Sequence, residues 1–220
     1  MQESLLFVLN RENSIASHFI AQLRNINVQN DRMRFRRNME RIGEVLGYEL
    51  SRSLSYEDVS ISTPLEQTKA ARLTQLPVLI SVLRAGMPLH QGLLNYFDEA
   101  DSGFVGAFRD HSVADKDFDI ALQYFAIPDI QDRQLLLVDP MLASGQTLVN
   151  VCQHILNIGR PAHIHIVSAI GSPEGLAYLR QQMQVSFSVW LGALDERLNE
   201  HAYIIPGLGD AGDLSYGPKI

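Results

Sequence analysis

The chain has 220 residues, a formal net charge of −7 and a hydrophobic content of 46%. This length is sufficient for a substantial core, and we expect one domain over residues 1–220. The negative charge disfavours a general nucleic-acid-binding protein, which needs a basic surface. The single cysteine, Cys152, excludes an internal disulfide and a multi-cysteine metal site. We find neither a membrane-length apolar run nor signal-peptide features, so we expect a cytoplasmic protein without membrane contact.

A long helix is predicted over residues 31–53, near the start of the chain. The apolar residues that recur there at helical spacing are Phe35, Met39, Ile42, Leu46 and Leu50. The basic run at residues 32–37 is interpreted as a solvated helix face or a subunit contact, in preference to an RNA contact. Further on, Thr63, Pro64 and Glu66 have the pattern of a capping box, which predicts that a second helix begins in residues 63–73.

Five apolar runs then predict strands that are buried in a sheet, and helical patterns separate several of them. The predicted strands are residues 78–83, 104–108, 134–139, 163–171 and 187–194. The predicted helices are residues 88–97, 147–157 and 172–183, with an extended or hairpin segment at residues 119–130. Strands that alternate with helices predict an α/β fold with a mainly parallel twisted sheet flanked by helices.

The predicted strand ends carry the candidate binding residues. In a parallel sheet, ligands bind beyond the carboxyl ends of the strands. Two of these ends carry arginines, Arg84 and Arg109, which can bind phosphate through paired donors. A third end leads into residues 139–147, a small-residue loop before a helix, which is a natural anion site. Asp139 suits sugar hydroxyls, so the acid and the anion loop suggest a sugar phosphate. The two arginines and the anion loop together suit a ligand with two separated phosphate groups.

Each of these features also has a simpler interpretation. The loop alone could be an ordinary connection between strand and helix, and each arginine alone could form a structural ion pair.

Residues 207–212 match G-x-G-x-x-G, but no acid follows at the required distance, so we reject a dinucleotide site. We expect instead a folded loop that offers backbone groups to a flat ligand such as uracil, with Asp210 available for a cation or a ribose. The residues interpreted as structural or core are Cys152, His163, His165 and Trp190.

Four segments resemble the uracil phosphoribosyltransferase family, and the resemblance extends over nearly the whole chain. They are residues 31–50, 80–94, 135–147 and 201–213. The Asp-Pro pair in the phosphate loop and the tail "YIIPGLGDAGD" are specific in combination. The resemblance implies a phosphoribosyltransferase-like fold with an N-terminal helical arm and a β-flap. It also implies that uracil and 5-phospho-α-D-ribose 1-diphosphate react to UMP and diphosphate with Mg²⁺, which is held mainly by diphosphate and water.

The resemblance assigns roles residue by residue. The residues matched to phosphoribosyl diphosphate are Arg84, Arg109, Asp139, Pro140, Met141, Leu142, Ala143, Ser144, Gly145, Gln146, Thr147 and Asp210. Those matched to uracil are Ile204, Gly209, Asp210 and Ala211. Arg84 and Asp210 are the candidate catalytic residues. The resemblance also implies a homodimer or a larger homo-oligomer, with GTP as a possible effector.

The chain departs from the family pattern at two places. Its loop reads Ala-Ser-Gly-Gln-Thr where relatives often have Ala-Thr-Gly-Gly-Ser, which keeps a hydroxyl at both ends. Its flap segment "YFAIP" is one residue shorter than usual and lacks a lysine. Three alternatives stay open: a catalytically silent nucleotide-binding relative, a pyrimidine-responsive RNA-binding regulator, and a transferase for another base.

Overall fold

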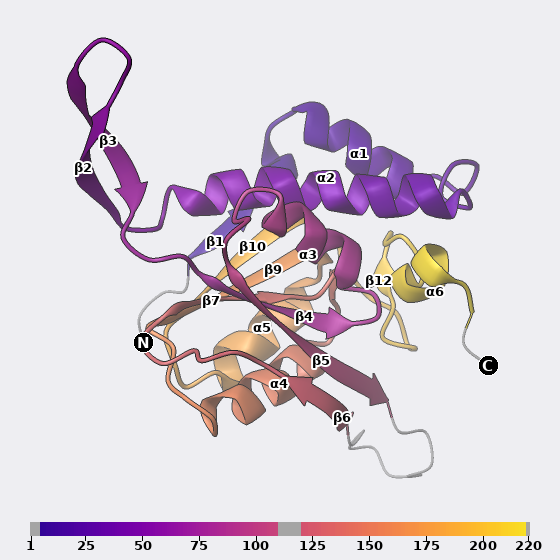
Figure 1. Cartoon of the computed structure of the whole chain (residues 1–220). Coiled ribbons are helices and arrows are strands. Elements are labelled where there is room, and N and C mark those ends of the chain that lie inside the picture. Colours follow the sequence, from indigo (N-terminus) through magenta and orange to yellow (C-terminus); the bar gives the residue numbers. More distant parts are fainter. Residues whose placement is uncertain (1–4, 110–119, 219–220) are drawn as a thin grey trace.

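A computed structural model describes residues 5–109 and 120–218, with the side chains of residues 107–109 and 120–123 left out. An eight-stranded sheet forms its centre, in the order β1-β10-β9-β7-β4-β5-β6, with β8 beside β9 (Figure 1). Every pairing in it is parallel except that of β5 with β6. The strands are β1 (Leu6–Val8), β4 (Val78–Leu83), β5 (Asp101–Arg109), β6 (Ile120–Ala126), β7 (Gln134–Val138), β8 (Met141–Leu142), β9 (His163–Gly171) and β10 (Phe187–Leu194). The predicted mainly parallel α/β fold is thus confirmed.

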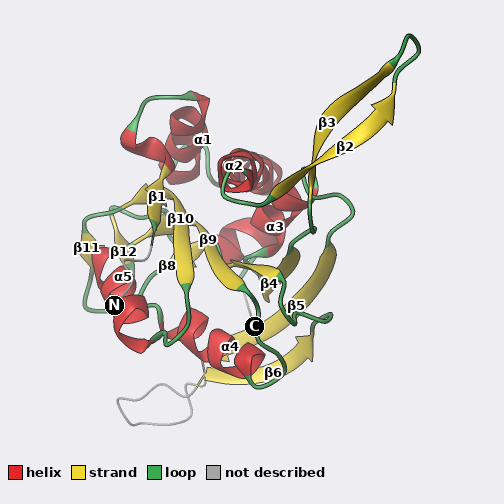
Figure 2. Ribbon diagram, turned by 90° about the vertical axis from the view of Figure 1, so that its left-hand side faces the viewer, coloured by secondary structure: helices red, strands yellow, loops and turns green. Residues whose placement is uncertain are grey.

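Helices cover both faces of this sheet, as Figure 2 shows. The α-helices of the described residues are α1 (Ile15–Arg24), α2 (Arg32–Ser51), α3 (Met87–Leu94), α4 (Gln146–Leu156), α5 (Pro173–Gln182) and α6 (Ala211–Tyr216). Smaller elements are the 3-10 turn η1 (Leu9–Arg11) and the strands β2 (Tyr56–Ser62), β3 (Gln67–Leu73), β11 (Arg197–Leu198) and β12 (Ile204–Ile205). Within the described part of the chain, no helix is both long and apolar enough to cross a membrane.

Strand β7 shows why the sheet needs helices on both faces. Leu136 and Val138 pack in one core with α1, α2 and α3, whereas Leu135 and Leu137 pack in a second core with α4 and α5. All four side chains are fully buried. Since burial of one such side chain stabilises a fold by about 1.5–3 kcal/mol, the continuous apolar run is what holds β7 between the two helical layers.

The predicted long helix is α2, and it forms the N-terminal helical arm together with α1. Its five predicted apolar residues are each at most 1% exposed. Asp31 caps it by accepting the Arg34 N–H at 3.0 Å. The basic run is paired within the chain at two positions, because Arg34 lies 3.8 Å from Asp31 and Arg37 lies 2.6 Å from Glu40.

The prediction that a helix begins in residues 63–73 is wrong. Residues 56–73 form a two-stranded antiparallel hairpin, β2–β3, which projects from the body of the molecule (Figures 1 and 2). The Thr63 hydroxyl accepts the N–H groups of Leu65 and Glu66 at 3.2 and 3.1 Å, and it donates to the Glu66 carbonyl at 2.8 Å. Threonine closes a hairpin turn with the same local bonds that begin a helix, so the capping pattern was ambiguous.

The antiparallel pair of β5 and β6 agrees with the predicted hairpin segment and with the implied β-flap. Tyr124, the first residue of the "YFAIP" departure, lies in β6 and is 53% exposed. The residues that connect the two strands, 110–119, lie outside the described residues. The effect of the missing lysine stays a prediction.

Candidate active site

The carboxyl ends of β4, β5 and β7 meet at one edge of the sheet, because β4 pairs parallel with both neighbours. Arg84 follows β4, Arg109 ends β5, and the loop at residues 139–147 follows β7. The prediction that these three features come together is therefore confirmed for the backbone. The Arg109 side chain lies outside the described residues.

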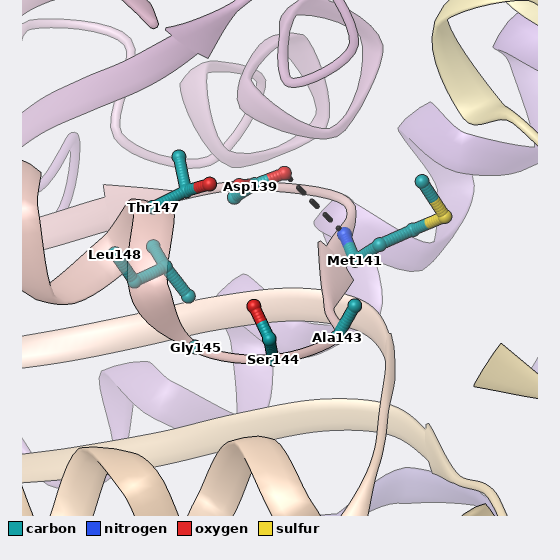
Figure 3. A pocket seen from close by; sticks show the side chains of 7 residues that line it. All are labelled: Asp139, Met141, Ala143, Ser144, Gly145, Thr147 and Leu148. Carbon is teal, nitrogen blue, oxygen red and sulfur yellow. Dashed lines mark hydrogen bonds between the residues drawn. The ribbon is translucent and has the colours of Figure 1, made fainter. Parts of the chain in front are cut away.

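A cavity of about 140 Å³ opens at the end of β7. Its lining residues are Asp139, Met141, Ala143, Ser144, Gly145, Thr147 and Leu148 (Figure 3). Asp139 Oδ1 accepts a long hydrogen bond from the backbone nitrogen of Met141 at 3.5 Å, at the start of the loop. The predicted hydroxyl donors Ser144 and Thr147 both face this cavity, as the close-up shows.

The first turn of α4 is arranged to bind an anion. Gly145 is the N-cap residue of this helix, with φ +81°, and among the described residues no side-chain hydrogen bond caps the helix. Of the other α-helices, α3 also begins without a side-chain cap, whereas the side chains of Ser14, Asp31, Ser172 and Asp210 cap α1, α2, α5 and α6. Uncapped N–H groups and the helix dipole together attract negative charge. The cavity is thus positioned for a phosphate group.

The loop owes its shape to bonds from β9 and from the start of α5. The Pro140 carbonyl accepts the N–H groups of Ala169 and Ile170 at 3.0 and 3.2 Å. The Ser172 hydroxyl donates to the Ala143 carbonyl at 2.7 Å. Pro140 is buried, and Leu142 is fully buried in the core. Within the loop at residues 139–147, the residues that are not among the cavity lining of the described chain are Pro140, Leu142 and Gln146.

The C-terminal tail is only in part the loop that the sequence predicted. Residues 206–210 form a loop between β12 and α6, with positive φ at Gly207 and Gly209. Residues 211–216, however, form the short helix α6. Asp210 caps this helix by accepting the Asp213 N–H at 2.9 Å. The Asp-x-x-Asp spacing could have indicated the cap, but the surrounding glycines favoured a loop.

Arg84 follows β4, the strand beside β7, and its side chain contacts this tail. One of its terminal nitrogens donates to the Gly217 carbonyl at 3.2 Å and lies 3.5 Å from the Asp213 carboxylate. The Arg84 side chain is 39% exposed, and within the described structure its Nε is buried without a hydrogen-bond partner. Arg84 and the Asp210 helix therefore lie at the same edge of the sheet, as predicted. Figure 1 shows α6 beyond the end of β4.

Three side chains from the N-terminal arm hold the tail, and the sequence did not single them out for this role. Arg36, in the basic run, donates to the Ser215 carbonyl at 2.7 Å, and its guanidinium lies 6.0 Å from the centre of the Tyr216 ring. Arg24 and Gln29 contact the loop before α6. These contacts join parts of the chain that are far apart in sequence, so no local pattern signals them.

The residues interpreted as structural lie away from this edge. Cys152 is fully buried in α4, and burial raises the pKa of its thiol to about 12, so it is unreactive. His165 Nε2 donates to Gln134 Oε1 at 3.0 Å, and its Nδ1 accepts the Ser188 hydroxyl at 2.8 Å and the Trp190 indole N–H at 3.2 Å. These partners confirm a structural role for His165 and a core position for Trp190, which is 4% exposed.

Known proteins resemble this chain along nearly its whole length. The family model described as uracil phosphoribosyltransferase matches residues 10–218. A uracil phosphoribosyltransferase from Porphyromonas gingivalis is 43% identical over 213 residues, which cover 96% of this chain and 98% of the relative. One from Thermococcus gammatolerans is 34% identical over 204 residues, covering 91% and 88%.

Solved structures agree with this result. The AQ2163 protein from Aquifex aeolicus superposes with a TM-score of 0.86 at 27% identity, covering 98% of this chain and all of its own. A hypoxanthine phosphoribosyltransferase from Staphylococcus aureus reaches a TM-score of 0.51 at 13% identity, covering 84% and 83%, and thus shares the fold. The family match includes both arginines, the phosphate loop and the tail, and the chain belongs to the uracil phosphoribosyltransferase family.

Proposed function

We propose that the chain transfers the phosphoribosyl group of 5-phospho-α-D-ribose 1-diphosphate to uracil, which gives UMP and diphosphate. The observation that supports this most strongly is the pairing of an uncapped helix start at Gly145 with a glycine-containing tail at the same sheet edge. Arg84 follows β4, the strand beside β7, and donates to the Gly217 carbonyl just after the tail helix. A phosphate site and a backbone-lined loop are what a phosphoribosyl donor and a small base require.

Each part of the site has a role in this reaction. The first turn of α4, with Ser144 and Thr147, binds the 5-phosphate, and Asp139 accepts bonds from the ribose hydroxyls. The bond from the anomeric carbon to the diphosphate oxygen breaks and its electron pair leaves with diphosphate, while a bond to a uracil nitrogen forms and the proton of that nitrogen passes to solvent. Arg84 stabilises the charge that develops on the leaving diphosphate. The tail orients uracil against the anomeric carbon.

Mg²⁺ is the cofactor that we propose. Throughout the described residues, no group of three or more His, Cys, Asp or Glu side chains could hold a metal ion. Magnesium commonly binds through one or two carboxylates, water and substrate phosphates, and single carboxylates such as Asp139 and Asp210 fit that pattern. When bound, Mg²⁺ would neutralise charge on the diphosphate. Chelation with EDTA should therefore abolish turnover, and added Mg²⁺ should restore it; full activity in EDTA would contradict this assignment.

The central experiment is to incubate the protein with uracil, phosphoribosyl diphosphate and Mg²⁺ and to measure UMP. Turnover of hypoxanthine or orotate instead, without UMP, would contradict uracil transfer. The absence of any product would favour a silent relative, and an RNA shift that depends on UMP would favour a regulator. GTP activation and a cytoplasmic location stay predictions from the sequence, and the same assay with and without GTP tests the first.

We further propose that the protein is a homodimer or a larger homo-oligomer, with hairpin β2–β3 in the contact between copies. No residue of these two described strands is buried, and Leu65 at the turn is 95% exposed. A two-stranded hairpin alone is marginally stable in water, so it gains stability from a second copy. Sedimentation should show an oligomer that an Ile61→Glu, Leu65→Glu variant dissociates. A monomeric parent would contradict the proposal.

A further inference from the structure

We propose that Arg24 and Asp195 act as a positioning pair that fixes the uracil-binding tail, residues 204–211, and thereby sets the affinity for the base. This inference rests on the proposed uracil transfer. Neither side chain is matched to a substrate contact, and both lie behind the tail.

Asp195 holds the tail through a buried charge. It follows the last residue of β10, and its side chain is 3% exposed. Its Oδ2 accepts the Gly207 N–H at 2.8 Å and an Arg24 N–H at 2.7 Å, and its Oδ1 accepts a second Arg24 N–H. A buried carboxylate needs a full set of partners. Its position is therefore fixed by both the arm and the tail.

Arg24, the last residue of α1, is the other member of this ion pair and also contacts the tail. In addition to Asp195, it donates to the Gly207 carbonyl at 3.0 Å. The N–H and the C=O of Gly207 are thus both held by one ion pair. Gly207 has φ +65°, and a Cβ there would lie 2.1 Å from the Ile204 carbonyl oxygen. This turn cannot shift without breaking the pair or the backbone geometry that only glycine allows.

Gln29 adds a second point of attachment from the same arm. Its side-chain amide donates to the Leu208 carbonyl at 3.0 Å and to the Leu23 carbonyl at 2.8 Å. The next tail residue, Gly209, is matched to uracil. Two consecutive residues before the base contact are therefore anchored to α1 and the turn that follows it.

The consequence is an effect on uracil that exceeds the effect on the phosphoribosyl donor, because Asp210 is the one tail residue among those matched to the donor. Displacement of a substrate-orienting group by about 1 Å can cost roughly 100-fold in rate. Loss of the pair should displace Gly209, which serves the base, but not the loop after β7, which serves the phosphate. The pair thus acts on the KM for uracil through the tail.

The test compares Arg24→Gln with the parent in steady-state kinetics. We expect the KM for uracil to rise at least about tenfold, with the KM for phosphoribosyl diphosphate changed less than about twofold. Asp195→Asn should have a smaller effect, because its amide oxygen still accepts the Gly207 N–H. Arg24→Gln combined with Asp195→Asn should cost less than the sum of the two single changes, since both remove one interaction.

Arg133→Gln is the matched control. Arg133 is 18% exposed, against 22% for Arg24, and it binds Asp101 at 2.5 Å. It precedes β7 and its partner begins β5, so this pair lies at the opposite edge of the sheet. The control should lower stability and leave the KM for uracil unchanged. A merely structural role for Arg24 would give the same pattern in both variants.

If Arg24→Gln does not fold, Gln29→Ala is the variant measured in its place. A KM for uracil within about twofold of the parent value in Arg24→Gln, or in Gln29→Ala where Arg24→Gln does not fold, would overturn the proposal. Hydrogen exchange gives a readout that does not need turnover, because the Gly207 amide should exchange faster in Arg24→Gln, or in Gln29→Ala, than in the parent. A parent that makes no UMP but shows this difference would contradict the proposed reaction and retain the positioning pair, whereas unchanged exchange would overturn the pair.

Discussion

Asp210 combines two roles that a single substitution can separate. Its carboxylate caps α6, and its charge lies at the edge where the reaction takes place. Asparagine caps helices about as well as aspartate, so Asp210→Asn should leave the tail in place while it removes the charge. We expect turnover to fall by at least about tenfold, with the KM for uracil changed by less than about threefold. Steady-state kinetics measure both quantities.

The control for this prediction is Asp210→Ala, which removes both the charge and the cap. It should lower the free energy of unfolding by about 1 kcal/mol relative to Asp210→Asn. If Asp210→Asn keeps turnover within a few-fold of the parent, Asp210 has no part in the chemistry and serves only as a cap.

At the scale of single residues, the sequence predicted what local patterns can mark. Arg84 and Asp139 each follow a buried apolar run directly, so their place at the sheet edge follows from the strand alone. Arg24 and Asp195 are 171 residues apart, and each looks like an ordinary surface charge in its own segment. Their pairing depends on how α1 lies against the tail, which is a property of the folded chain.

At the scale of elements, the hairpin β2–β3 is likewise a feature that local sequence patterns do not predict. Thr63 forms the local bonds that its capping pattern predicts, yet the chain after it continues as a strand. The difference is decided by pairing between β2 and β3, where residues Tyr56 and Leu73 face each other across the ladder. Helix α5, in contrast, was predicted correctly, because Ser172 caps a segment that also packs its apolar residues against the sheet.

Ser172 couples α5 to the phosphate loop, which leads to a prediction for this element. Its hydroxyl accepts the Gly175 N–H at 2.9 Å and donates to the Ala143 carbonyl at 2.7 Å, and the residue is fully buried. Ser172→Ala should lower the free energy of unfolding by about 1–2 kcal/mol, measured by chemical denaturation. The KM for phosphoribosyl diphosphate should also rise, because Ala143 lines the cavity.

Ser14→Ala provides the comparison for this effect. Ser14 caps α1 in an exposed position, by accepting the Ala16 N–H at 3.2 Å, and it does not line the cavity. Its loss should cost about 0.5–1 kcal/mol and leave the KM for phosphoribosyl diphosphate unchanged. Equal kinetic effects of the two substitutions would show that the Ser172 bond to the loop has no influence on the site.

At the scale of the whole molecule, the central sheet could be predicted from the sequence, whereas the positions of the N-terminal arm and of the β2–β3 hairpin could not. Buried apolar runs such as those of β4 and β7 must lie between two helical layers, so their pattern predicts the fold. The N-terminal arm and the projecting hairpin carry polar and apolar residues that fit several arrangements. Their positions depend on contacts between distant parts of the chain and, for the hairpin, on the proposed second copy.

Two buried histidines predict that stability of the whole molecule falls in acid. Burial lowers the pKa of His165 to about 3, with a smaller effect from His163 nearby, and burial lowers the pKa of His90 to about 4. In the unfolded chain both would titrate near 6.5. Between these values the unfolded state binds protons that the folded state does not, so the free energy of unfolding falls as the pH drops below about 6.5.

His165 alone should contribute a loss of about 2–3 kcal/mol between pH 6 and pH 4, with no contribution above pH 7. Denaturation curves at several pH values measure this dependence, and a His90→Gln, His165→Gln variant separates it from that of the carboxylates. The variant should be less stable than the parent at pH 7, because His165 loses its bonds to Ser188 and Trp190. Its free energy of unfolding should nevertheless fall less steeply in acid, and an equal slope would mean that the two buried rings do not control the acid limit of the fold.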